Sequence, residues 1–281
     1  MKTLLLDVGG TFIKCSDGRE IPIRSDGSRE EISSSFAEAV GAFCNEDSCV
    51  NDAETASGNR QRDGEIAVAI PGPFDYERGI FLMKHKFSAV YGMSFREVAG
   101  VPSCVPPTSS HDVNVMLAGE MFYGNGRGYS RVALVALGTG LGFAMSIDGR
   151  ILKKATGSPL VSIFGLPYRD GILEDYASKR GFLGTFKALG GQGAATVKDI
   201  AEFAGGGDKV ALETFRTIGS TIARTISPIL KEYGIECLLF GGQISRSFRF
   251  LEPALREGLS GVESLVAISQ VSDFDNATFN G

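Results

Sequence analysis

Short apolar runs separated by glycine turns open the chain. The segments TLLLDV, FIKC and EIPIR are divided by Gly9-Gly10 and Asp17-Gly18. Glycine and Asp-Gly pairs between apolar runs favour tight hairpin turns, because glycine accepts the positive φ that such turns often need. The pattern therefore predicts three short strands at the N-terminus, joined as hairpins.

A helical pattern and two further strands are predicted next. In REEISSSFAEAVGAF the apolar residues recur at every third or fourth position, which predicts an amphipathic helix. Residues 45–63 are polar and lack a period, so they predict a solvated loop or a weakly ordered helix start. EIAVAI predicts a buried strand that stops at Pro71-Gly72-Pro73, and GIFLMKH predicts another strand.

Strands and helices continue to alternate farther along the chain. RVALVALGTGLGFAMSIDGRI holds two apolar runs around a glycine turn, and ECLLF predicts a later strand. Helical spacing is present in VNVMLAGEMFYG, DKVALETFRTIGSTIARTISPILKEYG and SFRFLEPALREGL. This alternation favours an α/β fold with two lobes, residues 1–118 and 119–281. LLLDVGGTFIKC and LVALGTGLGFAM share one form, which indicates a duplicated hairpin lobe.

Composition excludes several classes of protein. Lys and Arg number 28 against 33 Asp and Glu, and the net charge of −5 does not favour a nucleic-acid partner. Apolar runs are too short for a membrane span, and the N-terminus lacks a signal-peptide pattern. Five cysteines form no CxxC pair and only two histidines are present, so we expect reduced thiols, a cytoplasmic location and no zinc.

Glycine contributes 37 of the 281 residues, and its placement points to a ligand. Three glycine loops each follow an apolar strand directly: Gly9-Gly10-Thr11, Gly138-Thr139-Gly140 and Gly241-Gly242. Without a Cβ, backbone N–H groups can approach a phosphate closely, and threonine adds a hydroxyl donor. Any one loop is also compatible with a plain hairpin turn, but three together favour a nucleotide site. No P-loop or Rossmann spacing occurs.

Charged residues accompany these loops. Lys14 follows the first turn and could offer its charge to a phosphate, while Asp7 could hold Mg²⁺ through water. Asp112 starts a predicted helix, and two interpretations of it stay open. It is either an N-cap for that helix or a general base that deprotonates a substrate hydroxyl for attack on a γ-phosphate.

These segments, in their order, resemble the ROK family of sugar kinases and sugar-sensing repressors, within the hexokinase–actin superfamily. DVGGTFIK is similar to the first phosphate motif of the family, ALGTGLGFAM to its second and FGGQIS to its adenosine motif. AIPGPFDYERG resembles the PGP-x-D segment, HDVNVMLAGE the NDAN-x-x-x-x-GE helix, and GILEDYASKRG the stretch after the zinc motif of the family.

The resemblance implies a two-lobed actin-like ATPase fold of the ribonuclease H-like type with a central cleft, together with ATP and Mg²⁺ as cofactors. It implies a glucokinase-like enzyme that phosphorylates a hydroxyl of a sugar or related polyol. Asp112 would be the catalytic base, and Pro71, Gly72 and His111 would lie near the sugar. The nucleotide would be bound by Gly9, Gly10, Thr11, Lys14, Gly138, Thr139, Gly140, Gly241 and Gly242. By analogy with the family, a homodimer is the expected assembly.

The chain departs from the family pattern on the sugar side. His111 stands where the family has Asn, and the ExGH segment and the zinc cluster are missing between residues 155 and 175. Ser158, Tyr168, Arg169 and Asp170 are candidate substitutes, and substrates other than glucose stay open. A non-catalytic sensor of nucleotide or sugar is the alternative function.

Both ends of the sequence also bear on this comparison. The first phosphate motif begins at residue 4, ahead of which the repressors of the family carry a helix-turn-helix, so DNA binding is not expected. The sequence stops at residue 281, where the final helix of the family would start.

Overall fold

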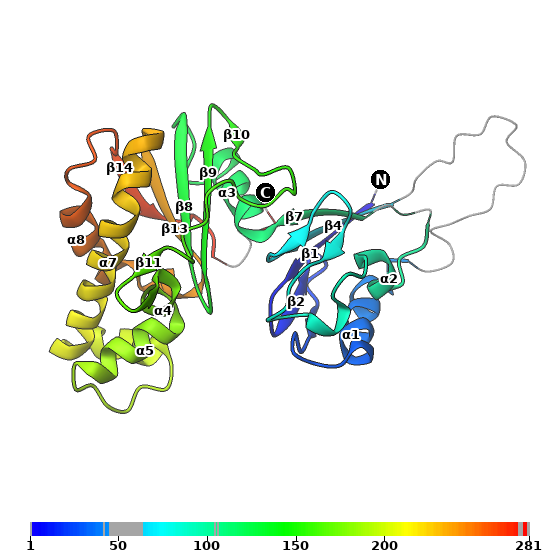
Figure 1. Cartoon of the computed structure of the whole chain (residues 1–281), viewed down its shortest axis with the longest axis horizontal. Coiled ribbons are helices and arrows are strands. Elements are labelled where there is room, and N and C mark those ends of the chain that lie inside the picture. Colours follow the sequence, from blue (N-terminus) through cyan, green and yellow to red (C-terminus); the bar gives the residue numbers. More distant parts are fainter. Residues whose placement is uncertain are drawn as a thin grey trace, which may run out of the picture. The chain divides into compact units, whose positions relative to one another are not determined.

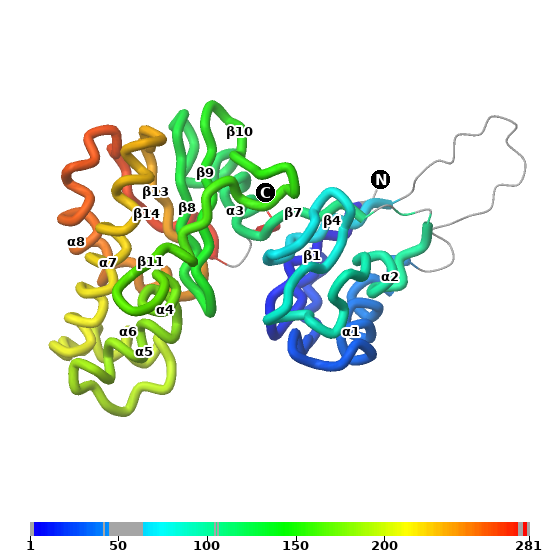
Figure 2. The backbone as a smooth tube through the Cα atoms, viewed as in Figure 1, coloured from blue at the N-terminus to red at the C-terminus, as the bar shows by residue number. Residues whose placement is uncertain are grey.

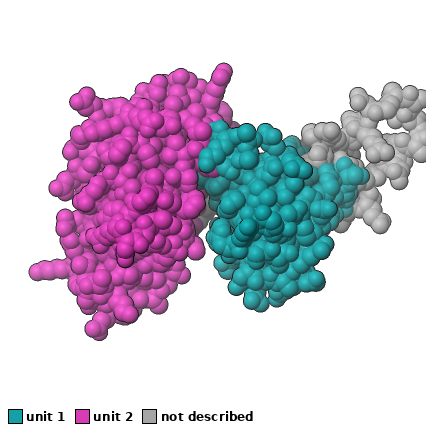
Figure 3. All heavy atoms as spheres, viewed as in Figure 1, with its two compact units in different colours: residues 1–115, 153–158 teal, residues 116–152, 159–281 magenta. Residues whose placement is uncertain are grey.

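The computed structural model describes residues 2–41, 43–44, 64–103, 105, 107–274 and 278–279. The chain forms two compact units, which are coloured separately in Figure 3. Unit 1 comprises Met1–Val115 and Lys153–Ser158, and unit 2 comprises Met116–Leu152 and Pro159–Gly281. The division thus falls three residues before the expected boundary, and unit 1 also includes a short later segment that the sequence pattern did not indicate.

Unit 1 is built on a five-stranded sheet with the order β3-β2-β1-β4-β7. Its strands are β1 (Lys2–Val8), β2 (Phe12–Cys15), β3 (Glu20–Pro22), β4 (Gly64–Ile70) and β7 (Pro107–His111). β1, β2 and β3 pair antiparallel through the predicted glycine turns, whereas β4 and β7 run parallel to β1. The hairpins predicted at the N-terminus are therefore confirmed.

An aromatic cluster forms the core beside this sheet. The helices α1 (Arg29–Gly41) and α2 (Phe95–Ala99) pack against each other, as Figure 1 shows. α1 also contacts β2 and β3. The fully buried rings belong to Phe36, Phe74, Phe81, Phe87 and Phe95. Their centroids lie 5.1–6.0 Å apart at tilted or edge-to-face angles, an arrangement that the ring quadrupoles favour.

The strand predicted for GIFLMKH is almost absent. Only β6 (Ile80–Phe81) forms there, and it pairs with β5 (Phe74–Asp75) as a two-residue hairpin. The chain then leaves the strand, because Met83 and Phe87 turn into the aromatic core and a short 3₁₀ helix, η2 (Ser88–Val90), follows. Packing in the aromatic cluster, rather than strand pairing, therefore buries the apolar side chains Phe81 and Met83 of this run.

Unit 2 repeats the sheet topology of unit 1. Its sheet has the order β10-β9-β8-β13-β14. The strands are β8 (Arg131–Leu137), β9 (Leu141–Ile147), β10 (Arg150–Ile151), β13 (Cys237–Gly241) and β14 (Ala267–Gln270). β8, β9 and β10 are antiparallel, and β13 runs parallel to both β8 and β14. The duplicated hairpin predicted from the two Gly-Thr turns is confirmed.

Helices and small elements complete unit 2. They are α4 (Leu173–Ala177), α5 (Lys179–Ala188), α6 (Val197–Gly205), α7 (Lys209–Tyr233), α8 (Phe248–Leu259), the 3₁₀ helix η3 (Gln243–Ser247) and the hairpin of β11 (Pro167–Tyr168) and β12 (Gly171–Ile172). α7 contacts the other four α-helices of this set, and Figure 2 shows it running beside α8. A Cβ on Gly258 would lie 2.7 Å from the Cβ of Ala223, so glycine permits this close helix packing.

The helix α3 (Asp112–Phe122) contains the division between the units. The predicted helices for REEISSSFAEAVGAF, VNVMLAGEMFYG and the two later segments are confirmed as α1, α3, α7 and α8. The loop predicted for residues 45–63 lies outside the described residues. Within the described ranges, no helix combines the length and apolarity that a membrane crossing requires.

Candidate functional site

Three loops leave the same edge of the sheet in unit 1. β1, β4 and β7 are parallel neighbours, so their carboxyl ends meet at one edge. Gly9 follows β1, Pro71 follows β4 and Asp112 follows β7. This edge is where α/β folds bind ligands. The structure therefore brings together three segments that the sequence analysis singled out separately.

The first glycine turn leaves two backbone donors available. The Gly9 N–H donates to the Phe12 carbonyl at 2.9 Å, and a Cβ on Gly9 would lie 3.1 Å from that oxygen, so Gly9 closes the hairpin. The N–H groups of Gly10 and Thr11 take part in no hydrogen bond with any described residue. Thr11 is also exposed, which fits a turn that cradles an anion.

Asp112 combines a structural contact with an available oxygen. Its Oδ1 accepts the Val113 N–H at 2.7 Å and lies 2.7 Å from His111 Nδ1. No described residue donates a hydrogen bond to its Oδ2, and the side chain is 37% exposed. Asp112 therefore stabilises the start of α3 with one oxygen and leaves the other for a ligand.

The pKa of Asp112 is lowered by its surroundings. Burial is the largest influence and raises the pKa, but the hydrogen bond and charge of His111, the Val113 N–H and the charge of Lys86 together outweigh it. The carboxylate is therefore ionised at neutral pH, as a proton acceptor must be.

His111 presents its second ring nitrogen to the PGP segment. Because Nδ1 is paired with Asp112, Nε2 is the nitrogen left for a ligand. A Cβ on Gly72 would lie 3.4 Å from this Nε2 and 3.4 Å from Tyr76 Oη, so glycine keeps the space open. Tyr76 donates to the Ile70 carbonyl at 2.9 Å, and burial together with the Asp112 charge raises its pKa. The Gly72-Pro73 peptide is cis.

Asp7 and Lys14 occupy paired positions on the sheet. They face each other across β1 and β2, and Lys14 Nζ lies 4.0 Å from Glu20 Oε1. The described residues hold no group of three or more His, Cys, Asp or Glu side chains that would enclose a metal ion. A single carboxylate at a phosphate site fits Mg²⁺, which keeps several waters and binds largely through substrate phosphates.

The segment Lys153–Ser158 is attached to this part of unit 1. The Tyr76 N–H donates to the Thr156 carbonyl at 3.1 Å, and Asn114 Nδ2 donates to the Gly157 carbonyl at 3.2 Å. Gly157 has a φ of +82°, and a Cβ there would lie 2.7 Å from Tyr76 Cβ. Asn114 Oδ1 is buried and has no partner among the described residues. Of the candidate sugar-side substitutes, Ser158 alone belongs to this unit.

The second glycine loop, residues 138–140, is closed by α4 and α5. The Gly138 N–H donates to the Gly140 carbonyl at 3.1 Å, and the Lys179 N–H donates to the Gly138 carbonyl at 2.9 Å. Glu174 Oε2 accepts the Leu141 N–H at 3.0 Å, and a Cβ on Gly140 would lie 2.9 Å from that oxygen. Glu174 was missed by the sequence reasoning, although it lies in the quoted GILEDYASKRG segment.

Packing within unit 2 already requires glycine at both positions of the third loop, Gly241 and Gly242. A Cβ on Gly241 would lie 2.4 Å from Met116 Sδ, so α3 packs directly on this residue. Gly242 has a φ of +79°, and a Cβ there would lie 2.4 Å from the Leu137 carbonyl oxygen. Gly242 thus touches the end of β8, next to the loop that begins at Gly138. The structure brings the second and third glycine loops together in unit 2.

The hairpin of β11 and β12 lies in the region where the family has its zinc cluster, and in this chain contacts between protein side chains hold it. Tyr168 Oη lies 3.0 Å from Thr221 Oγ1, and the Arg169 guanidinium lies 5.5 Å from the ring centroids of both Tyr168 and Tyr176. Tyr176 also donates a hydrogen bond to Asp170. The side chains of Tyr168, Arg169 and Asp170 are therefore engaged within unit 2.

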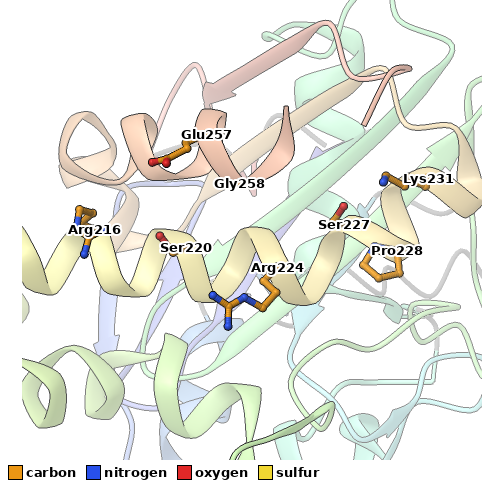
Figure 4. A pocket seen from close by; sticks show the side chains of 8 residues that line it. All are labelled: Arg216, Ser220, Arg224, Ser227, Pro228, Lys231, Glu257 and Gly258. Atoms are coloured by element: carbon orange, nitrogen blue, oxygen red, sulfur yellow. The ribbon is translucent and has the colours of Figure 1, made fainter. Parts of the chain in front are cut away.

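A pocket of about 600 Å³ lies between α7 and α8 of unit 2, as Figure 4 shows. Arg216, Arg224, Lys231 and Glu257 are among its lining residues. None of its lining residues comes from a predicted motif. Arg224 points away from Glu257 in Figure 4, so the charged groups do not converge on one ligand position.

The duplicated sheets with glycine turns at their strand ends define an α/β protein of the actin-like ATPase class. The chain belongs to the ROK family, whose family model matches residues 6–159 and 167–272. The fold class and the family predicted from the sequence are both confirmed.

Individual relatives include kinases and a repressor. The chain is 26% identical to a glucokinase of Thermotoga maritima over 221 residues, which cover 69% of this chain and 70% of that enzyme. It is 25% identical to the DNA-binding transcriptional repressor Mlc of Escherichia coli over 239 residues, 78% of this chain and 58% of the repressor. A ROK family glucokinase from Streptomyces griseus, solved with glucose and AMPPNP, shares the fold with a TM-score of 0.73 at 21% identity, covering 99% of this chain and 96% of that one.

Proposed function

We propose that this protein is an ATP-dependent kinase that phosphorylates a hydroxyl group of a sugar or related polyol, with Asp112 as the general base. One observation carries the proposal. An ionised, accessible carboxylate stands at the same sheet edge as a glycine turn whose Gly10 and Thr11 N–H groups are available. Phosphoryl transfer needs a positioned hydroxyl, a proton acceptor and donors for the phosphate oxygens.

Each residue of this edge has a defined task in the proposal. Asp112 Oδ2 accepts the proton of the substrate hydroxyl, while the contacts of Oδ1 with His111 and Val113 fix the orientation of the carboxylate. The acceptor occupies the open space over Gly72 and contacts His111 Nε2. The N–H groups of Gly10 and Thr11 donate to phosphate oxygens. A positioned general base typically contributes about 10²–10⁴ to the rate.

The cofactors belong to the same proposal. ATP is supported by the likeness to the Streptomyces griseus glucokinase, which was solved with AMPPNP. Asp7, at the end of β1 beside the glycine turn, would hold Mg²⁺ through water. Bound Mg²⁺ would neutralise phosphate charge. The nucleotide residues proposed in unit 2 are Gly138, Thr139, Gly140, Gly241 and Gly242, of which the last two also have packing roles.

The test is release of ADP by the purified protein with Mg²⁺-ATP and a panel of hexoses, amino sugars and polyols. We expect sugar-dependent release that falls by roughly 10²–10⁴ in Asp112→Asn, whereas the affinity for ATP changes less than about twofold. Asp26→Asn is the matched control, because Asp26 is an exposed aspartate of the same unit. Equal loss of ATP binding and turnover in Asp112→Asn would mean that Asp112 is only a structural cap.

A second candidate function is a sensor that binds nucleotide or sugar without turnover. The similarity to the repressor Mlc favours it, as does the absence of the Glu and His that grip the sugar in the family. Clear binding of ATP by the wild-type protein, with no ADP release from any member of the panel, would establish this function instead of the kinase.

A further inference from the structure

Lys86 is held over the first glycine turn by its neighbour in the chain. Phe87 is fully buried in the aromatic cluster of unit 1, and its N–H donates to the Ser25 carbonyl. The N–H of Ser25 in turn donates to the Gly10 carbonyl at 3.3 Å. These two backbone bonds connect the segment that carries Lys86 to the turn at Gly10.

The side chain of Lys86 points to the open face of that turn. A Cβ placed on Gly10 would lie 3.9 Å from both Cε and Nζ of Lys86 and 3.4 Å from Ser25 Oγ. Lys86 is partly buried, and its ammonium forms no hydrogen bond or ion pair with any described residue. A partly desolvated cation with its donors unused therefore stands beside two unused backbone N–H groups.

Lys86 is also near the proposed base. Its positive charge is one of the influences that lower the pKa of Asp112, together with His111. An ionised Asp112 repels a phosphate group brought to the same sheet edge, because like charges a few Å apart are only weakly screened in a partly buried site. A cation shared by the turn and the carboxylate offsets this repulsion.

We propose that Lys86 binds the phosphoryl group that is transferred, by donating from Nζ to a terminal phosphate oxygen seated over Gly10 and next to Asp112. This inference rests on the proposed kinase function. In the transfer, the bond between the β–γ bridging oxygen and the γ-phosphorus breaks and leaves ADP. A bond forms between the substrate hydroxyl oxygen and the γ-phosphorus, and the hydroxyl proton moves to Asp112. Lys86 stays protonated and neutralises charge on the transferred group.

Lys14, the cation expected from the sequence, is less suited to this task. It lies 4.0 Å from Glu20 and opposite Asp7, so acidic groups already balance its charge. Lys86 has no such partner among the described residues. The difference assigns the phosphate contact to Lys86.

The experiment compares Lys86→Met and Lys86→Arg with Lys84→Met as the matched control. Lys84 lies in the same segment, and its substitution removes the same charge. Its Nζ, however, lies 5.5 Å from the Tyr91 ring centroid instead of over the turn. Steady-state ADP release gives kcat and the KM for the acceptor. Calorimetry gives the Kd for ATP and for inorganic tripolyphosphate, which contains phosphate but no nucleoside.

We expect Lys86→Met to lower kcat by about 100-fold or more and to weaken tripolyphosphate binding by roughly tenfold, with the acceptor KM within about twofold. Lys86→Arg should recover part of both losses because it keeps a donor and a charge. The acidic limb of the kcat/KM profile should also move to higher pH in Lys86→Met, because this variant loses a positive charge that lowers the pKa of Asp112. His111 and Tyr76 are then the ionisable neighbours left to Asp112.

Two outcomes would overturn the inference. Lys86→Met and Lys84→Met could behave alike in turnover and tripolyphosphate binding, which would make Lys86 a solvated surface residue. Alternatively, Lys86→Met could raise only the acceptor KM, which would place Lys86 on an anionic group of the acceptor. If the wild-type protein shows no turnover, the kinase proposal fails. The tripolyphosphate comparison of the two variants still decides whether Lys86 binds phosphate.

Discussion

Glu120 offers the sharpest test of how α3 is held in unit 2. Its side chain is 2% exposed, and its carboxylate accepts three hydrogen bonds of 2.8 Å each. Oε1 accepts from the N–H and the hydroxyl of Ser272, and Oε2 accepts from the Asn125 N–H. Glu120 therefore ties the end of α3 to the chain that follows β14. We predict that Glu120→Ala is strongly destabilising.

The expected magnitude follows from these contacts. A hydrogen bond to a charged acceptor contributes about 1.5–3 kcal/mol. The donors belong to the exposed residues Asn125 and Ser272, so they can turn to water once the carboxylate is removed. The contributions of the hydrogen bonds do not add fully, because the three donors share one carboxylate. We expect Glu120→Ala to lower the free energy of unfolding by about 4 kcal/mol. Glu120→Gln should lose about 2 kcal/mol, since its amide keeps one oxygen acceptor but turns an NH₂ group toward a donor.

Urea denaturation followed by circular dichroism measures these losses, and a Tm lower by about 10 °C in Glu120→Ala is the matching thermal result. Glu252→Ala is the control. Glu252 is bonded to Arg256 at 2.8 Å on the surface of α8, so its removal should cost less than about 1 kcal/mol. A loss of less than about 1 kcal/mol in Glu120→Ala would refute the reasoning, because the three bonds would then be replaced by water without cost.

Further predictions concern the glycine loops and the base. A Cβ on Gly10 meets only ordinary contacts of 3.4–3.9 Å, so Gly10→Ala should change the free energy of unfolding by less than about 1 kcal/mol. The same variant should weaken ATP binding measured by calorimetry, and an unchanged affinity would show that Gly10 does not belong to the site. Gly242→Ala should instead cost more than about 2 kcal/mol, because φ is +79° and the Cβ would lie 2.4 Å from the Leu137 oxygen, and a wild-type urea midpoint would contradict this. His111→Ala should raise the pKa of Asp112 and move the acidic limb of kcat/KM to higher pH. Because the pKa of Asp112 is lowered in the folded protein, its carboxylate stabilises the fold fully above the ordinary aspartate pKa, and this contribution is lost as the pH falls through the lowered value. An acidic limb that does not move in His111→Ala would show that His111 does not influence the base.

Local sequence determined most of the elements of this protein. The turns at Gly9-Gly10 and Asp17-Gly18 and the periodicity of α7 were readable because each depends on residues a few positions apart. The short apolar run GIFLMKH was misread as a strand, since period and composition do not distinguish a strand from a coil buried by aromatic side chains.

Tertiary structure alone decided which residues meet at the sheet edge of unit 1. Parallel pairing of β1, β4 and β7 brings Gly10, Gly72 and Asp112 together, although tens of residues separate them in the chain. Sequence reasoning missed Lys86 because this residue lies outside every motif that was recognised, and only the burial of Phe87 places it over Gly10. Strand pairing and core packing depend on contacts between distant residues, and no local pattern encodes those contacts.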